Sequence, residues 1–516
     1  MGLIPYRNEA YLDWADEKNT AAMQEALGKV GGELGKLYPL VIGGREVETD
    51  GGIPSVNPAK PSEVVGTTGS ATTEEADLAL RTATEVFETW SRTAPEARAR
   101  VLLRASAIMK RRKFEFLAWE KFEGGKPWAE ADAQVAEAID FLEYYAREML
   151  RLKDGVPIYS VPGEESSYFY RPMGVGVVIA PWNFPTAILT GMSAAAIVAG
   201  NTVIMKPSEF TSVIGAKVAE VFAEAGLPDG VLNYLPGYGA EIGDYLVGDP
   251  RTRFISFTGS MKTGLGINEL AAKRGPKQRW IKRVIAEMGG KDAMVIDESA
   301  DTDAAAFDIV KSAYGYSGQK CSAASRAIIH AEVYDEVLEK VLLNARRLKI
   351  GPPDSADVNI GPVISEPQFA KVTSYIDSGD REGERLLGED PGDGSDGYFV
   401  SPTIFATDEK AKVAREEVFG PVLSVLRARD FDDALRIAND SPYGLTGGVY
   451  SRNREHLERA RNEFKAGNVY FNRTITGALV GVQPFGGFDL SGTDSKAGGP
   501  DYLPLHMLAK TVVERF

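Results

Sequence analysis

Between residues 175 and 274 one local pattern occurs four times in succession: a short apolar run, a turn and a helix-like segment. The apolar runs are "VGVVI", "TVIMK", "VLNYL" and "RFISF". Consecutive strand–helix units of this kind predict an α/β fold with a parallel sheet covered by helices on both faces. Ligands of such sheets bind at the carboxyl ends of the strands, so we expect the functional residues in the turns.

Length and charge set the broad limits. A chain of 516 residues exceeds the size at which one core stops growing, so we expect two or three lobes. The formal net charge of −15 argues against nucleic acid as the main partner. The first residues show no basic-then-apolar signal pattern, and a single cysteine fits a reducing compartment, so we expect a cytoplasmic protein.

Two apolar patterns need separate readings. The stretch "ILTGMSAAAIVAGNTVIM" is interrupted by two glycines and Asn201, which favours a buried helix followed by a strand over a membrane span. In "QVAEAIDFLEYYAREML" apolar residues recur every three or four positions and predict one helix stripe. That stripe serves either internal packing or a subunit contact. It consists of Val135, Ile139, Leu142, Ala146 and Met149.

The only cysteine, Cys321, lies in "GYSGQKCSAASR" among small residues. A buried structural cysteine is one reading, since free cysteine is often buried. Its small neighbours favour the other reading, a backbone that comes close to another molecule. The three histidines show no metal-ligand spacing, so we expect no metal site. A base other than histidine should then serve the thiol.

Two further segments suggest chemistry for this thiol. Glu287 precedes the pair Gly289–Gly290, and a carboxylate free to swing on a glycine hinge is a plausible base for activating water. Asn183 lies in "PWNFP", where prolines fix its backbone and its amide can donate to an oxyanion. Together with Cys321 and the dinucleotide turn described next, they predict a thiolate that adds to an aldehyde, a hydride that passes to a dinucleotide, and a thioester that water hydrolyses.

Two turns suit that dinucleotide. In "FTGS" Gly259 opens a tight turn and a helix begins near Ser260, whose free N–H groups could hold a pyrophosphate, although an ordinary helix cap has the same pattern. In "MKPSE" Lys206 and Glu209 follow a strand. A carboxylate there could bind a ribose diol and repel a 2′-phosphate, which favours NAD over NADP. The alternative is a surface pair that flanks the Ser208 cap.

The motifs "PWNFP", "KPSE", "FTGS", "EMGGK", "GQKC", "EEVFGPV" and "PFGG" occur in the order typical of the NAD(P)-dependent aldehyde dehydrogenase superfamily. From about residue 38 onward the chain resembles this superfamily. The resemblance implies a Rossmann-like nucleotide-binding lobe, an α/β catalytic lobe, a small β oligomerisation element and an N-terminal arm. We expect the nucleotide-binding lobe at 38–154 and 176–286 and the catalytic lobe at 287–489. The oligomerisation element is expected at 155–175 and 490–516, and the arm at 1–37.

The same resemblance assigns roles to residues. Cys321 and Asn183 would form the oxyanion site, and Glu287 would be the base. NAD is the implied cofactor, and a homodimer or larger homo-oligomer is the implied assembly. The implied cofactor residues are Lys206, Ser208, Glu209, Gly259, Ser260, Glu417 and Phe419.

Residues around the nucleophile narrow the substrate. Lys320 and Ser322 add a cation and a hydroxyl, and the N–H groups of Gly477 and Ala478 could cradle a carboxylate. This combination resembles the branch of the superfamily that oxidises L-glutamate γ-semialdehyde to glutamate in proline catabolism. By that resemblance two aromatic residues would pack the aliphatic stem of the substrate. They are Phe184 and Phe485.

Other functions stay open at this point. The substrate could be another carboxylated aldehyde, such as succinate semialdehyde. The chain could also be a cysteine acyl hydrolase, or an inactive scaffold on the same fold. If the leading reading holds, the semialdehyde comes from a separate proline dehydrogenase, with which a transient contact is expected.

Overall fold

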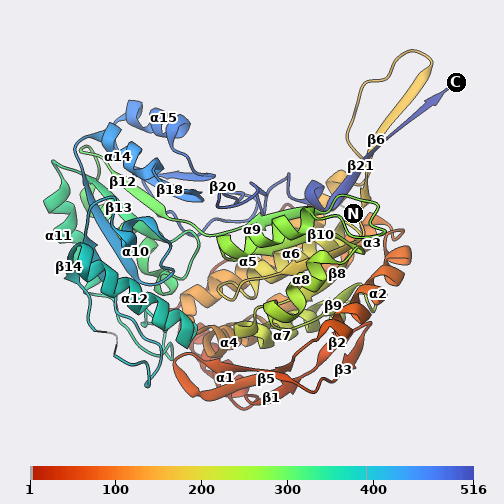
Figure 1. The fold of residues 1–516 in the computed structure, drawn as a ribbon, viewed down its shortest axis with the longest axis horizontal. Helices are drawn as coiled ribbons and strands as arrows, with labels where there is room; N and C mark the ends of the chain where they lie inside the picture. Colours follow the sequence, from red (N-terminus) through yellow and green to blue (C-terminus); the bar gives the residue numbers. More distant parts are fainter. Residues whose placement is uncertain (1–3, 391) are drawn as a thin grey trace.

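The computed structural model describes residues 4–390 and 392–516 and contains two lobes, each built around a seven-stranded sheet (Figure 1). In the first sheet the strand order is β11-β10-β7-β8-β9-β2-β3. The strands are β2 (Leu40–Ile42), β3 (Arg45–Val47), β7 (Val175–Ile179), β8 (Thr202–Lys206), β9 (Leu232–Tyr234), β10 (Thr252–Thr258) and β11 (Arg283–Glu287). Strands β7 to β11 pair in parallel, and β2 and β3 are the antiparallel edge.

The four repeated units therefore form the parallel part of this sheet, as the sequence predicts. Helices follow each strand: α6 (Ala187–Val198), α7 (Ser212–Glu224), α8 (Asp244–Gly248) and α9 (Met261–Ala272). The stretch that follows residue 187 is a buried helix and then the buried strand β8, as expected. Within the described residues no helix is long and apolar enough to cross a membrane.

The second sheet has the order β14-β15-β16-β13-β12-β18-β19 and is parallel except at its β14 edge. Its strands are β12 (Asp292–Ile296), β13 (Ala324–His330), β14 (Glu384–Leu387), β15 (Thr403–Ala406), β16 (Val422–Ala428), β18 (Thr446–Tyr450) and β19 (Asn468–Phe471). Its main helices are α10 (Thr302–Tyr314), α11 (Tyr334–Ala345), α12 (Glu366–Glu382), α14 (Phe431–Asn439) and α15 (Arg454–Glu463). Separate apolar clusters lie on its two faces.

A helical layer packs on the first sheet. It consists of α2 (Thr73–Trp90), α3 (Pro95–Arg111), α4 (Lys113–Gly124) and α5 (Trp128–Leu152). All five residues of the predicted stripe on α5 are buried in the largest core, and α5 contacts α3 and α6. Of the two readings of this stripe, internal packing is therefore the one that the structure supports. The chain also has an N-terminal helix, α1 (Glu17–Gly31), and a small sheet of β1 (Lys36–Tyr38), β4 (Gly52–Asn57) and β5 (Lys60–Gly69).

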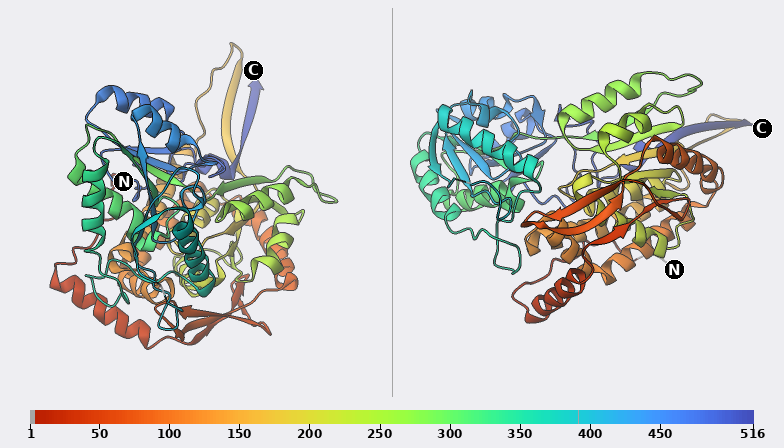
Figure 2. Two further views of the ribbon diagram at one scale, coloured as in Figure 1. Left: turned by 60° about the vertical axis from the view of Figure 1, so that its left-hand side comes forward. Right: turned by 60° about the horizontal axis from the view of Figure 1, so that its bottom comes forward.

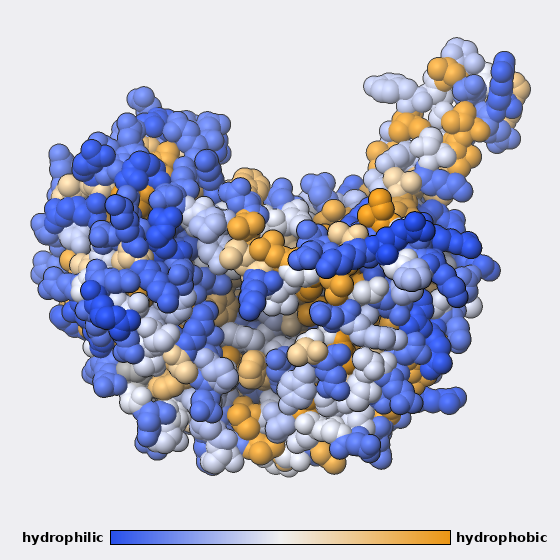
Figure 3. Space-filling model, in the orientation of Figure 1, coloured by the Kyte–Doolittle hydropathy of each residue, from blue (hydrophilic) through white to orange (hydrophobic). Residues whose placement is uncertain are grey.

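A hairpin-like arm projects from the body of the molecule (Figures 1 and 2). Strand β6 (Glu164–Pro172) pairs antiparallel with the C-terminal strand β21 (Met507–Arg515) along nine residues of each. Apolar side chains are gathered on this arm, as the orange surface in Figure 3 shows. The exposed ones include Ile158, Tyr159, Val161, Val512, Val513 and Phe516.

Candidate active site

Cys321 lies in the short turn between a 3-10 segment, Gly315–Gly318, and β13. Tyr316 and Ser317 have left-handed backbone angles, with φ of 51° and 56°. Two buried hydrogen bonds hold them there: Tyr316 Oη donates to the carbonyl of Gly124, and Ser317 Oγ donates to that of Gly361. Non-glycine residues in this region are strained, and such strain is characteristic of functional sites. The thiol that follows is half-buried.

A first cavity contains the thiol and every predicted substrate residue. It is lined by Cys321 and Glu287 together with Phe184, Lys320, Ser322, Gly477, Ala478 and Phe485. These residues come from both lobes and from a C-terminal loop, so only the fold brings them together. Sequence motifs spread over 302 positions of the chain therefore converge on one space.

A second cavity meets the first at Cys321. It is lined by Asn183, Gly259, Ser260, Glu417 and Phe419, which the sequence assigned to the oxyanion and the cofactor. The other three predicted cofactor residues, Lys206, Ser208 and Glu209, line neither cavity. They lie at the carboxyl end of β8, where the side chain of Ser208 accepts a hydrogen bond from the N–H of Phe210.

The residues of the second cavity fit a dinucleotide. Ser260 is the N-cap of α9, so a helix N-terminus with its partial positive charge borders the cavity. Glu417 Oε1 accepts from the N–H of Gly290 at 3.0 Å, and burial raises the pKa of this carboxyl. A Cβ at Gly289 would lie 2.4 Å from the same carboxylate, so a larger residue there would displace the Glu417 side chain. Phe419 packs edge-on against Trp182.

The carboxyl group of Glu287 is held, which differs from the free hinge that the sequence suggested. Glu287 ends β11, and its Oε2 accepts from the N–H of Gly487 at 3.0 Å. Its Oε1 accepts from both the hydroxyl of Ser495, at 2.6 Å, and the N–H of Ser495, at 3.2 Å. Burial outweighs these bonds and raises the pKa of Glu287 to about 7. The role of Ser495 had no motif to signal it.

The thiol of Cys321 is held in its protonated form. Burial raises its pKa well above the usual range, and the nearby carboxyl groups of Asp292, Glu417 and Glu287 add to this effect. Positive charge that enters either cavity would favour ionisation to the nucleophilic thiolate.

Backbone N–H groups around the first cavity are free to bind a ligand. In the described part of the chain, the amides of Cys321, Gly477 and Ala478 have no acceptor within the protein. Gly477 has a left-handed φ of 76°. Successive N–H groups near a left-handed residue form an anion-binding nest. This observation supports the carboxylate cradle predicted for the two loop residues.

Asn183 is positioned by a buried lysine that sequence reasoning missed. Its side-chain amide donates to the carbonyl of Gln319 at 3.0 Å, and its own carbonyl accepts from Lys126 Nζ at 2.6 Å. Lys126 also lies over the rings of Phe184, at 4.5 Å, and Tyr316, at 4.3 Å. Burial lowers the pKa of Lys126 to about 8. One cation thus contacts the oxyanion residue, the cavity wall and the cysteine loop.

Sequence reasoning also missed the acidic side of the first cavity. Glu130, Glu137 and Asp140 of α5 line it. Burial raises the pKa of Glu137 to about 7 and that of Asp140 to about 6. Lys320, expected to bring a net cation, instead pairs with Glu130 at 2.6 Å. The sequence does carry a signal for this acidic side, since positions 130, 137 and 140 repeat at helical spacing.

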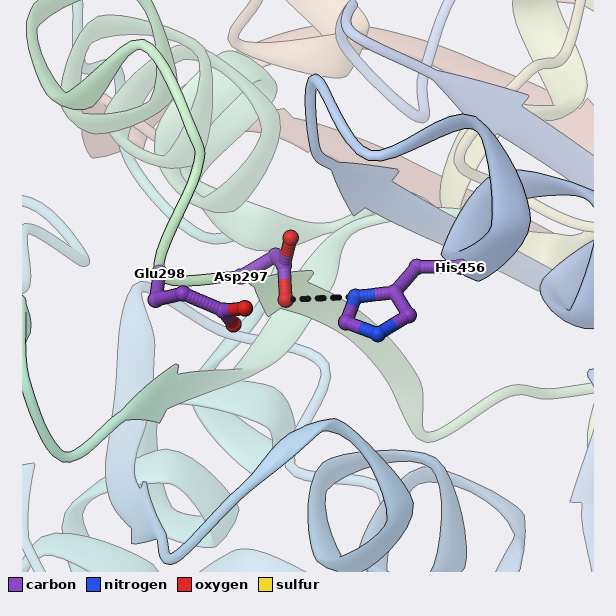
Figure 4. A group of neighbouring side chains, drawn as sticks. All are labelled: Asp297, Glu298 and His456. Carbon is purple, nitrogen blue, oxygen red and sulfur yellow. Dashed lines mark hydrogen bonds and ion pairs between the residues drawn. The ribbon is translucent and has the colours of Figure 1, made fainter.

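A second group of titratable side chains lies at the far end of β12, where Asp297, Glu298 and His456 meet (Figure 4). Asp297 Oδ1 lies 3.0 Å from His456 Nδ1, and Oδ2 accepts from Ser299 and Ser451. The His456 ring stacks on Phe431 with centroids 4.2 Å apart. Hydrogen bonds within the protein thus already engage both oxygens of this carboxylate.

The chain belongs to the aldehyde dehydrogenase family, whose sequence model matches residues 46–512. It is 58% identical over 513 residues to the 1-pyrroline-5-carboxylate dehydrogenase of Geobacillus thermodenitrificans, covering 99% of both chains. It resembles the crystal structure of the 1-pyrroline-5-carboxylate dehydrogenase from Thermus with bound NAD, with 55% identity, a TM-score of 0.98 and full coverage of both chains. A proline utilization A structure from Bdellovibrio bacteriovorus matches at 43% identity and TM-score 0.97, over 99% of this chain and 53% of that one.

Proposed function

We propose that this protein is a 1-pyrroline-5-carboxylate dehydrogenase, which oxidises L-glutamate γ-semialdehyde to L-glutamate with NAD in proline catabolism. The observation that carries this proposal is one cavity that contains a cysteine, a carboxyl base and two backbone N–H groups without a hydrogen-bond acceptor in the protein. Identity of 55–58% over the full chain to enzymes of that name supports the same activity.

Cys321 is the nucleophile in the proposed mechanism. Its sulfur adds to the aldehyde carbon and forms a thiohemiacetal, while Asn183 Nδ2 and the free amide of Cys321 stabilise the oxyanion. NAD bound in the second cavity would supply the hydride acceptor, and loss of the hydride from the thiohemiacetal oxyanion would leave a thioester on Cys321. Glu287 then takes a proton from water, which attacks the thioester and releases glutamate. Because Glu287 has a pKa near 7, it can take up that proton at neutral pH.

The first cavity suits an amino-acid headgroup. The amides of Gly477 and Ala478 and the hydroxyl of Ser322 bind the α-carboxylate. Phe184 and Phe485 pack against the aliphatic chain of the substrate. The carboxyl group of Glu137 offers an acceptor for the α-ammonium group. Succinate semialdehyde lacks an ammonium group, so this acidic side favours the glutamate derivative over it. Lys320 orients Glu130 in this arrangement, because the two charges pair with each other.

NAD is held by residues of the first lobe and two of the second. Ser260 and Gly259 at the α9 N-terminus bind the pyrophosphate, and Lys206, Ser208 and Glu209 at the end of β8 bind the adenosine half. Glu417 and Phe419 bind the nicotinamide ribose. Support comes from the α9 cap geometry and the close approach of Glu417 to Gly289. The second cavity, which is lined by Gly259, Ser260, Glu417 and Phe419, supports it too.

The test is steady-state formation of NADH with L-glutamate γ-semialdehyde and with succinate semialdehyde. Wild type is expected to prefer the first aldehyde at least about tenfold in kcat/KM, since the second leaves buried acids unpaired. Cys321→Ala should abolish NADH formation. Equal or better rates with succinate semialdehyde would overturn the substrate assignment. Thioester hydrolysis without aldehyde-dependent NADH would instead indicate an acyl hydrolase.

We further propose the domain division and assembly that the sequence suggested. Residues 38–154 with 176–286 form the nucleotide-binding lobe, 287–489 the catalytic lobe, and 155–175 with 490–516 an oligomerisation element after an arm of 37 residues. The two sheets and the projecting β6–β21 arm support it. We also propose a homodimer or larger homo-oligomer in the cytoplasm. A transient contact with a separate proline dehydrogenase is consistent with the match to about half of the longer proline utilization A chain.

A further inference from the structure

The segment Tyr6–Leu12 runs between two walls of the first cavity and has no part in the mechanism above. One wall is helix α5, and the other is the loop that continues from Gly477 and Ala478 to Val480. Tyr11 of the segment lines the cavity itself. The contacts of its neighbours show what holds it there.

The carbonyl of Val480 receives two donors from the segment. Tyr6 Oη donates to it at 3.1 Å and Asn8 Nδ2 at 2.9 Å. Tyr6 also packs edge-on against Tyr144 of α5, with ring centroids 5.5 Å apart. A Cβ at Gly481 would lie 3.0 Å from the Tyr6 ring, so the loop and the ring approach as closely as glycine allows. The segment therefore fixes the loop only two residues beyond the amides that face the substrate.

The other end of this bridge is the buried carboxylate of Asp140. Its Oδ2 accepts from Asn8 Nδ2 at 2.8 Å, and its Oδ1 accepts from the N–H of Glu9 at 2.7 Å. Asp140 is 3% exposed. One amide side chain, that of Asn8, thus joins the loop to α5.

A second carboxylate extends the same attachment. Asp132 is 1% exposed, and its Oδ2 accepts from the N–H of Leu12 at 2.6 Å. Its Oδ1 pairs with Lys113 Nζ at 2.7 Å, and Lys113 also donates to the carbonyl of Ala10. Buried carboxylates are costly without partners, so these contacts hold the segment on α5 at fixed register.

We propose that Tyr6–Leu12 is a positioning element of the active site: through Asn8 it sets the distance between the anchor loop and α5, and so determines affinity for the carboxylate-bearing aldehyde. This inference rests on the proposed function, since the loop amides matter only for a substrate that carries the α-carboxylate. An uncharged aldehyde makes no use of the loop and should be indifferent to the segment.

The test compares Asn8→Leu, which keeps the branched shape and the number of side-chain heavy atoms and removes both bridging hydrogen bonds, with Asn462→Leu on the exposed face of α15. Asn462 also donates one side-chain bond to a backbone carbonyl, so the chemical change is matched. KM and kcat are measured with L-glutamate γ-semialdehyde, with propanal and with NAD, and the inhibition constant of L-glutamate is measured in parallel.

Asn8→Leu is expected to raise KM for the semialdehyde and the inhibition constant of glutamate about tenfold each, because two hydrogen bonds of about 0.7 kcal/mol each are lost and about 1.4 kcal/mol corresponds to tenfold. Its kcat, its KM for propanal and its KM for NAD should stay within about twofold of wild type, as should every constant of Asn462→Leu. Tyr6→Phe, which loses one bond, should show a smaller rise of about threefold.

Unchanged semialdehyde and glutamate constants in Asn8→Leu, or in Tyr6→Phe if Asn8→Leu does not fold, would overturn the inference. A parallel rise for propanal would overturn it too, since that pattern indicates general loosening. Failure of wild type to oxidise the semialdehyde would overturn the proposed function instead, so the two failures are distinct.

Discussion

Glu287 illustrates how single residues in this site are tuned by opposing effects. Burial favours its neutral form, whereas the hydroxyl and N–H of Ser495 and the N–H of Gly487 stabilise its charged form. The balance leaves a pKa of about 7. A base is active only when deprotonated, so the carboxyl group should limit turnover on the acid side of neutrality.

We therefore expect kcat to fall about tenfold per pH unit below pH 7 and to level off above pH 8, because only the carboxylate activates water. Ser495→Ala removes a hydrogen bond to the charged form, so the pKa rises and the profile should move to higher pH by about one unit. The measurement is kcat from pH 5.5 to 9.5 for both proteins.

In Glu287→Gln one equivalent of NADH should form and then turnover should stall. A flat profile with normal Glu287→Gln turnover would assign the base elsewhere.

Lys126 belongs to the same scale, because its single ammonium group contacts three parts of the site. Lys126→Met keeps the stem and removes the charge, so the carbonyl of Asn183 loses its donor and Glu120 loses its ion-pair partner at 3.7 Å. We expect kcat to fall about tenfold to a hundredfold through misplacement of the oxyanion donor, with KM for NAD nearly unchanged. Lys273→Met, at the exposed C-cap of α9, is the control. Equal kcat in the two variants would contradict the positioning role.

At the scale of elements, the turn between β11 and β12 shows why sequence spacing alone is not sufficient. The sequence suggests a hinge at Gly289 and Gly290. In the structure, a Cβ at Gly289 would meet the Glu417 carboxylate at 2.4 Å, and one at Gly290 would meet Asp292 and the Cys321 carbonyl below 3.0 Å. Close approach of backbone to neighbouring side chains is therefore a sufficient reason for both glycines.

This reading gives a prediction with a built-in control. Gly289→Ala should displace Glu417 and raise KM for NAD about tenfold or more, since the cofactor cavity is lined by both residues. Gly266→Ala, in the middle of α9 with open space around its Cβ position, should leave kinetics unchanged and raise the free energy of unfolding by about 1 kcal/mol. The measurements are KM for NAD and the free energy of unfolding in urea, for both variants. Normal NAD binding in Gly289→Ala would show that Glu417 moves freely.

Local patterns were enough for part of this molecule. The four strand–helix units and the α5 stripe follow from periodicity, and the ordered motifs identify Cys321, Asn183 and Glu287, which do meet at one site. Long-range partners carry no such pattern. Ser495, Lys126 and the segment Tyr6–Leu12 reach the site only through the fold, so their contacts have no signal in sequence spacing. The ion pair of Lys320 has no signal in the sequence for the same reason, because Glu130 lies 190 positions away.

At the scale of the whole molecule, the β6–β21 arm is the feature that a single chain leaves unexplained. An isolated two-stranded hairpin is marginally stable in water, and an exposed apolar cluster on it indicates a partner surface. Its base is nevertheless fixed on the first lobe, since Arg283 donates to the carbonyl of Met507 and Ser256 contacts His506 in the core. A rigid base with an apolar, edge-exposed tip is suited to pair with a second copy of the chain.

Val513→Asp combined with Phe516→Asp should therefore convert the oligomer to a species with the mass of one chain, measured by light scattering during size-exclusion chromatography. Both side chains are exposed, at 54% and 80%, so the charges do not disturb a core. Leu343→Asp, at an equally exposed apolar position of α11, should leave the mass of the assembly unchanged. Because Cys321, Glu287 and Asn183 all come from the same chain, the arm variant should keep its NADH-forming activity per chain. A monomeric wild type, or an arm variant of unchanged mass, would show that these apolar residues do not hold copies together.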